Sequence, residues 1–252
     1  MKKILSAIFI LFLFFGSLAG AATDEDKTSS SAASPNINTL IKDLQGAERG
    51  PQLRAKATLI GMGQKAGPDL LKALDSASSG LSLDLVEILA ITRYQESAAR
   101  IEKIWQATKN SKLKLAAAEA LCRFNHNYAR YQGYILSQTR EGELDHRLQA
   151  MQMLGYIRDK RVIEPLVSIF QDPTQSDQIR QAAIWDLAHT PVKESAEALV
   201  NMVNDPEVDW FYKEIIISAI RRLAGQTDMA PIISKLLEKS QNIPASSGKG
   251  IK

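Results

Sequence analysis

One pattern of apolar residues repeats three times, at a spacing of 33 residues, in the second half of this chain. Arg147, Arg180 and Lys213 each open one copy. Small or apolar side chains follow each of them three, six and seven positions later, with Asp186 as the one polar exception. Positions three and four residues apart lie on one face of an α-helix, so each copy predicts a helix with one buried side.

The same register extends towards the N-terminus. Lys114, Asp84 and Arg54 precede Arg147 at spacings of 33, 30 and 30 residues, although the two earliest copies are degraded. A shorter apolar helix is expected after the three strongest copies, at 162–171, 195–203 and 231–238. Pro165 and Pro231 mark first turns of these helices, because proline lacks a donor that would be unpaired there anyway.

The repeating helix pairs predict the fold class. A single pair cannot bury enough apolar surface to offset the entropy of ordering it, so neighbouring pairs must cover one another. No segment alternates strictly between apolar and polar residues, which argues against strands. We therefore expect an all-α protein, an α-solenoid of about six stacked helix pairs, with end caps at 37–45 and 230–239.

The N-terminus has the order of a secretory signal peptide: Lys2 and Lys3, an apolar run over 4–15, and the small residues of 19–21. This run is shorter than the ~20 residues of a membrane span, which favours cleavage after Ala21 over a retained anchor. We expect a signal peptide at 1–21, a disordered linker at 22–36, the solenoid at 37–239 and a flexible tail at 240–252. The mature protein is expected in the periplasm or secreted, without stable membrane insertion.

The charge balance argues against polyanionic partners. The formal net charge is +3, and removal of Lys2 and Lys3 lowers it to +1. Such a balance gives no electrostatic reason to expect binding to nucleic acid or to an anionic membrane surface. Cys122 is the only cysteine, so the chain forms no internal disulfide.

Two segments resemble HEAT repeats, in particular the short bacterial type of the phycobilin lyases. They are RLQAMQMLGYIRDKRVIEPLVSIFQDP from Arg147 and IRQAAIWDLAHTPVKESAEALVNMVNDP from Ile179. Each has a helix with the order basic, alanine, leucine, then a turn and an apolar helix that ends in Asp-Pro. The resemblance implies that the second helix of each pair lines a concave surface.

The resemblance also implies a ladder of ion pairs, in which an aspartate of one turn pairs with a basic residue of the next helix. Asp172 with Arg180, and Asp205 with Lys213, match that spacing. Thr139 stands at the place that would pair with Arg147, so the ladder is interrupted there. We expect these residues to stabilise the fold.

Catalytic and metal-binding patterns are not found in the sequence. His126, His146 and His189 are scattered over three repeats, and Cys122 with His126 provides two metal ligands without a third. Cys122 is therefore expected to pack in the core. Neither a G-x-S-x-G elbow nor a glycine-rich phosphate loop occurs. We expect no enzyme activity, no cofactor and no metal.

A possible binding surface lies nine positions after the basic residue of each copy. Arg93, Arg123, Tyr156, His189 and Arg222 occupy this place in five copies. On stacked helices one register becomes one stripe, which suits an extended acidic partner. The alternative is that these cations only favour the dipoles of the helix C-termini, at about 0.3 to 1 kcal/mol each.

Two tryptophans are candidate anchors for a partner. Trp185 shares its register with Glu119, Gln152 and Ser218, which suggests a solvent-facing position, although Leu59 and Leu89 in the earlier copies suggest burial. Trp210 opens the last copy and either extends the same patch or belongs to the core at the end of the stack.

The sequence thus favours an exported, non-enzymatic HEAT-like scaffold that binds a protein or peptide through its concave helix face. One alternative is a lyase or chaperone-lyase that acts on a tetrapyrrole or a modified protein, as the resemblance implies. Another is a purely structural spacer of the cell envelope.

Overall fold

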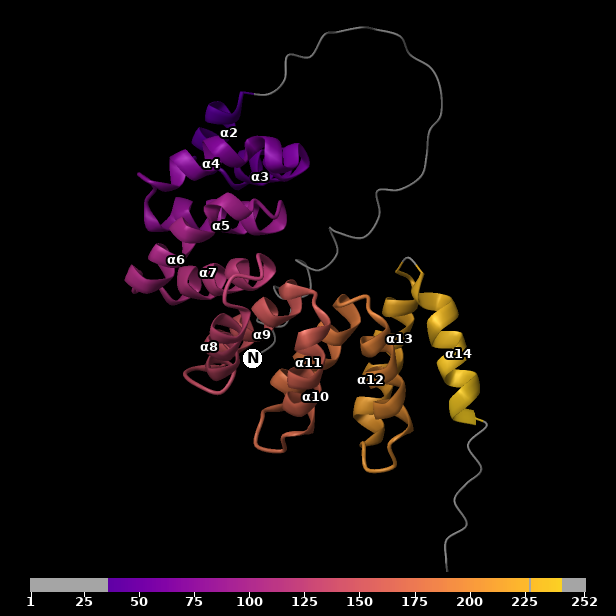
Figure 1. Ribbon diagram of the computed structural model, residues 1–252. Coiled ribbons are helices and arrows are strands. Elements are labelled where there is room, and N and C mark those ends of the chain that lie inside the picture. Colours follow the sequence, from indigo (N-terminus) through magenta and orange to yellow (C-terminus); the bar gives the residue numbers. More distant parts are fainter. Residues whose placement is uncertain (1–35, 227, 242–252) are drawn as a thin grey trace, which may run out of the picture. The chain divides into compact units, whose positions relative to one another are not determined.

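The computed structural model of this protein describes residues 36–226 and 228–241 (Figure 1). All the described residues belong to one compact unit, Asn36–Lys252. They form helices and turns without a strand, which confirms the all-α prediction. The predicted signal peptide, and the linker up to residue 35, lie outside the described residues.

The helices form two layers. The first layer contains α3 (Arg49–Met62), α5 (Ser79–Ile91), α7 (Ser111–Arg123), α9 (Leu144–Ile157), α11 (Asp177–His189) and α13 (Trp210–Ala224). The second layer contains α4 (Gly67–Leu74), α6 (Ala98–Ala107), α8 (Tyr128–Gln138), α10 (Ile163–Gln171), α12 (Lys193–Asn204) and α14 (Met229–Gln241). The short helix α2 (Ile37–Leu44) precedes them, and 3₁₀ turns at Gly63–Ala66, Gln95–Ser97 and Lys160–Val162 lead into α4, α6 and α10. Each first-layer helix packs against the next one in its layer, as a solenoid requires.

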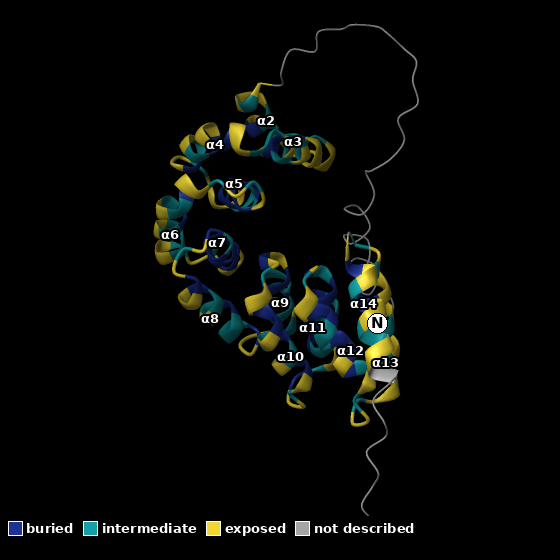
Figure 2. Cartoon of the chain, turned by 45° about the vertical axis from the view of Figure 1, so that its right-hand side comes forward, coloured by how far each residue is buried: buried dark blue, intermediate teal, exposed yellow. Residues whose placement is uncertain are grey.

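The first-layer helices lie on the inner side of the bend within this unit. Both views place α5, α7 and α11 inside and α6, α8 and α10 outside (Figures 1 and 2). The expectation had assigned the inner side to the second helix of each pair. In the structure the inner side is formed by the helix that contains the basic register residue, which is the first helix of each pair. The expectation fits only when a pair is counted across the Asp-Pro turn, as α10 followed by α11.

Equal register positions have equal surroundings. Ala117, Ala150 and Ala183 are all fully buried, as are Leu121, Leu154 and Leu187 four residues further on. Small and branched side chains at these buried positions allow close packing of neighbouring helices. The repeat pattern therefore predicted the core of the last four copies correctly.

The early copies differ because charged residues replace apolar ones in α5. Lys56 on α3 forms ion pairs with Asp84, at 3.0 Å, and with Glu87. Ile91, which takes the place of the buried leucines, is 43% exposed. The contact between α3 and α5 is thus partly ionic, and this explains why the repeat is weak in sequence there.

Both ends of the helical unit extend slightly beyond the expected limits. Asn36, assigned to the linker, caps α2: its side-chain oxygen accepts a hydrogen bond of 2.9 Å from the Asn38 amide. At the other end α14 continues to Gln241, two residues into the expected tail. Residues 242–252 lie outside the described part. Within that part, every helix is too short or too polar to cross a lipid bilayer.

Candidate partner-binding surface

The structure gathers the predicted stripe at one edge of the first layer. Its members stand at the C-terminal ends of five successive helices: Arg93 after α5, Arg123 in α7, Tyr156 in α9, His189 in α11 and Arg222 in α13. Arg93, Tyr156 and Arg222 are exposed, and Arg123 and His189 are half-buried. Because α5, α7, α9, α11 and α13 pack side by side, the five side chains follow one another along the stack.

An ion pair anchors the middle of this stripe. Arg123 forms an ion pair with Glu119, one turn earlier on α7. Burial raises the pKa of the Glu119 carboxyl to about 7, against the opposing effect of the Arg123 charge. Arg123 is therefore partly neutralised by its own helix, and less of its charge is available to a partner.

Arg158, which has no special position in the repeat, lies two residues beyond Tyr156 of the stripe. It ends α9 in the left-handed conformation, with φ 51° and ψ 46°, and its side chain is exposed. Burial, followed by the charges of Arg123 and Arg222, lowers the pKa of the Arg158 guanidinium. Position in the repeat does not single out Arg158, because the stripe position of α9 belongs to Tyr156.

His189 lies between these cations. Burial, followed by the charges of Arg222 and Arg158, lowers the pKa of its imidazole to about 4, although a hydrogen bond with the Trp185 backbone opposes the shift. The ring is therefore neutral at physiological pH. The predicted basic and aromatic stripe thus carries its positive charge on arginines alone.

Trp185 is more buried than its register suggested. Its side chain is half-buried and packs against the core. At the same register, Leu59, Leu89 and Glu119 are buried, and only Ser218 is fully exposed. The expectation of a solvent-facing position is therefore wrong for most copies, because the neighbouring first-layer helices cover this flank. Trp185 remains partly accessible, one helical turn before His189.

Trp210 does not extend this surface. It is 73% exposed and opens α13, whereas Arg222 lies twelve residues later on the same helix. At 1.5 Å per residue this separates the two by about 18 Å. The alternative, a buried position at the end of the stack, is also wrong for Trp210. It does hold for Tyr212, which is buried and donates a hydrogen bond of 2.7 Å to Asp177.

The expected ladder of ion pairs does not form among the described residues. Asp172 accepts hydrogen bonds from Thr174 and Gln175, and Asp205 from the Glu207 amide, instead of pairing with Arg180 and Lys213.

The basic register residues stabilise the stack in another way. The Nε atoms of Arg147 and Arg180 donate to the carbonyl oxygens of Thr139, at 2.9 Å, and of Phe170, at 2.7 Å. Both carbonyls are at the end of the preceding second-layer helix, where they lack a partner within the helix. These arginines thus have the structural role expected of them, but through carbonyl groups.

Comparison with known proteins gives the same architecture. Residues 135–221 match the family model described as HEAT repeats. This part of the chain thus consists of HEAT-like repeats. No curated protein matches the chain in sequence.

Two solved structures are similar to this HEAT-like protein at low identity. One is the complex of CpcE and CpcF of phycocyanin lyase from Nostoc, with 14% identity and a TM-score of 0.38 over 87% of this chain and 100% of that one. The other is an engineered protein, with 15% identity and a TM-score of 0.37 over 81% of this chain and 96% of that one. Similarity at this level carries no argument about activity.

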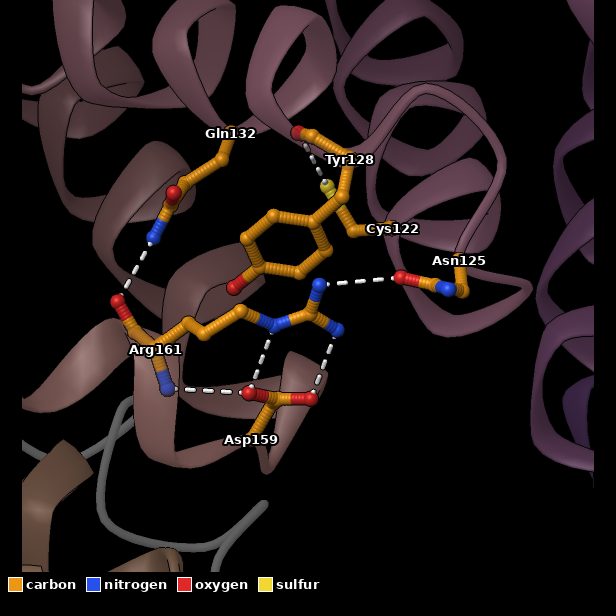
Figure 3. A network of polar contacts seen from close by, with 6 residues as sticks. All are labelled: Cys122, Asn125, Tyr128, Gln132, Asp159 and Arg161. Carbon is orange, nitrogen blue, oxygen red and sulfur yellow. Dashed lines mark hydrogen bonds and ion pairs between the residues drawn. The ribbon is translucent and has the colours of Figure 1, made fainter.

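Cys122 belongs to a structural network between two repeats (Figure 3). The thiol is buried and lies 3.8 Å from the Tyr128 carbonyl oxygen, and burial raises its pKa to about 12. His126, four residues later, pairs with Glu102 at 3.0 Å instead of with Cys122. The packing role predicted for Cys122 is therefore confirmed, and the two side chains have different partners.

Hollows elsewhere in the HEAT-like protein do not include the predicted site residues. One of about 270 Å³ lies between α4, α5 and α6 near Arg100, and one of about 260 Å³ lies near Asn38 and Lys72. Sites for small organic ligands usually measure about 300 to 1,000 Å³. Among residues 36–226 and 228–241, no group of three or more His, Cys, Asp or Glu side chains is placed to bind a metal. The arrangement therefore suits a surface contact better than a pocket.

Proposed function

We propose that this HEAT-like protein is an exported scaffold without catalytic activity, which binds a protein or peptide through the inner surface of its first-layer helices. The observation that carries the proposal is the alignment of Arg93, Arg123, Tyr156, His189 and Arg222 at the ends of five helices packed side by side. Repeat proteins bind partners along such extended surfaces, because each repeat adds one strip to a continuous face.

The partial exposure of Trp185 supports the same surface. Partly exposed tryptophan and arginine side chains are the residues that most often dominate the energetics of protein interfaces. Trp185 precedes His189 by one helical turn and Arg222 is on the next helix of the layer, so one partner segment can contact all three. The export part of the proposal rests on the signal-peptide pattern of residues 1–21 alone.

The test compares partners recovered by the wild type and by a Trp185→Ala, Arg222→Ala double variant. Both proteins are used as baits in an envelope extract, with recovered proteins identified by crosslinking and mass spectrometry. A Leu53→Ala, Arg221→Ala double variant is the matched control, because both residues are exposed and neither belongs to the surface. Circular dichroism first establishes that all three proteins are equally folded.

The proposal expects the first double variant, and not the control, to lose the partner. Equal recovery by wild type and double variant would remove this surface from consideration. Visible absorbance that copurifies with the protein would instead favour the lyase alternative that acts on tetrapyrroles. Altered envelope integrity on deletion, without any recovered partner, would favour the structural spacer.

A further inference from the structure

Arg158 occupies a backbone conformation that arginine rarely adopts. Its φ of 51° places it in the left-handed region, which is unfavourable for a residue other than glycine. The conformation ends α9 and turns the following residues towards the second layer. Arg158 therefore stands at the C-terminal end of α9, two residues beyond Tyr156 of the stripe, with its side chain exposed.

Arg158 and Arg222 lie on either side of the end of α11. Arg158 follows α9, Arg222 is in the last turn of α13, and α11 packs between these two helices. His189 is at the end of α11. The charges of both arginines lower the pKa of its imidazole, so both guanidinium groups act electrostatically on the same ring. Gln226 fixes this arrangement by donating a hydrogen bond of 2.6 Å to the Ala188 carbonyl oxygen.

Neighbouring acids do not neutralise this pair of arginines. Glu119 forms an ion pair with Arg123, and burial raises the pKa of the Asp186 carboxyl well above its ordinary value, which favours its neutral form. Neither Arg158 nor Arg222 forms an ion pair within the described part of the chain. Two like charges near each other repel, and an anion bound between them relieves this repulsion.

We propose that Arg158 and Arg222 bind carboxylate groups of an acidic, extended peptide segment of a partner protein, with the Tyr156 ring and the edge of Trp185 contacting its remaining side chains. This inference rests on the proposed function, since it names the chemistry of the partner for the same surface. Arginine suits such a role because its planar guanidinium pairs with a carboxylate through two parallel hydrogen bonds.

The spacing of the helices favours a peptide. Adjacent first-layer helices lie about 8 to 10 Å apart, which an extended chain covers in about three residues. Arg158 follows α9 and Arg222 is on α13, with α11 between them, so the two helices are about 16 to 20 Å apart and an extended chain covers this distance in about six residues. A peptide with an acidic residue at every third position therefore contains acids at the spacing of these two helices. A nucleic acid duplex would need a larger positive field than that of a chain with a net charge of +3.

The test measures binding of an acetylated, amidated peptide of repeated Glu-Gly-Ser triplets by calorimetry at low salt. A Gln-Gly-Ser peptide of equal length is the neutral counterpart, and inorganic phosphate is titrated separately. Arg158→Ala and Arg222→Ala should each weaken binding of the Glu peptide by about tenfold, the loss of one charge-assisted contact. An Arg49→Ala, Arg221→Ala variant removes two exposed arginines from other positions and should change the affinity by less than about twofold.

Several results would overturn the inference. Equal affinity for the Glu and Gln peptides would exclude carboxylate recognition, and an equal loss in the control variant would reduce it to a general charge effect. Tight binding of phosphate without binding of the Glu peptide would reassign the arginines to phosphate groups. If the Glu peptide fails to bind while the Trp185, Arg222 double variant still loses its cellular partner, the proposed function stands and only the carboxylate chemistry falls.

Discussion

The carboxyl group of Asp186 on α11 packs directly against Gly155 on α9, in a place where an alanine side chain would not fit. A Cβ atom on Gly155 would lie 2.6 Å from the Asp186 Cγ atom and closer still to its Oδ1 atom. Asp186 is only 8% exposed, and its Oδ2 atom has no hydrogen-bond partner in the described part of the protein. Glycine thus permits close approach of the two first-layer helices around a buried acid.

This contact predicts that Gly155→Ala destabilises the protein. The added methyl must displace Asp186 or separate α9 from α11, which costs about 1 to 3 kcal/mol of unfolding free energy. Gly133→Ala is the matched control, because a Cβ there meets no atom within 4 Å and alanine favours the helix. The Gly155→Ala, Asp186→Ala double variant should recover most of the loss. Urea unfolding measures all three, and additive losses in the double variant would contradict the proposed clash.

A second prediction concerns pH. Burial raises the folded-state pKa of Asp186 well above 3.8, so the folded protein binds a proton that the unfolded chain releases. Stability is therefore lost as the pH rises from about 3.8 through the folded pKa, and each pH unit within that interval lowers the unfolding free energy by about 1.4 kcal/mol. Asp186→Asn lacks this loss and should be more stable than the wild type at pH 7, with the difference shrinking towards pH 4. A Glu214→Gln variant, at an exposed position of α13, controls for general charge effects. A difference that does not vary with pH would refute the assignment.

The repeat period predicted the layers and most of the core, because burial on stacked helices depends mainly on position in the repeat. Ala117, Ala150 and Ala183 were assigned equal surroundings from their register, and the structure confirms it. Asp186 carried a usable signal as well, since it was the one polar residue at an apolar register position in the three strongest copies.

Three features could not be read from the period. The ion-pair ladder depended on distances between a turn and the following helix, and Asp172 accepts its hydrogen bonds from Thr174 and Gln175 rather than from Arg180. The burial of Trp185 depends on the flank of α11 that its neighbours cover. Arg158 is defined by a left-handed helix end, which no apolar pattern encodes. Each of these depends on the relative placement of neighbouring helices.

A third prediction separates carbonyl capping from the ion-pair ladder. Arg180 donates to the Phe170 carbonyl, and its guanidinium lies 5.2 Å from the Phe170 ring centroid and 4.3 Å from that of Tyr212. Arg180→Ala should lower the unfolding free energy by about 2 to 3 kcal/mol, the sum of a charged hydrogen bond and a cation–π contact. Lys213→Ala, at the equivalent position one repeat later, should change it by less than about 0.5 kcal/mol. Equal losses of unfolding free energy in the Arg180→Ala and Lys213→Ala variants would favour the ion-pair ladder over carbonyl capping.

The last prediction concerns Arg161, which joins two repeats (Figure 3). Its guanidinium forms two hydrogen bonds with Asp159, at 2.9 and 2.8 Å, and one of 2.9 Å with Asn125 in the turn between α7 and α8. It also lies 3.5 Å from the ring centroid of Tyr128, which it covers. Lysine keeps the charge but cannot form the paired hydrogen bonds and stack on the ring at once.

Arg161→Lys should therefore lower the unfolding free energy by about 1 to 2 kcal/mol at pH 7. Hydrogen bonds from Arg161 are the main cause that holds the pKa of Asp159 below 3.8. For a carboxyl with a lowered folded-state pKa, the stabilisation is present above the unfolded pKa and is lost as the pH falls through the folded one. The difference between wild type and variant should thus be constant above about pH 5 and shrink below pH 4. Arg140→Lys, at an exposed position, is the control and should have no measurable effect. A loss that persists unchanged into acid would place the contribution of Arg161 in its contact with Tyr128 and Asn125 alone, since those do not depend on ionised Asp159.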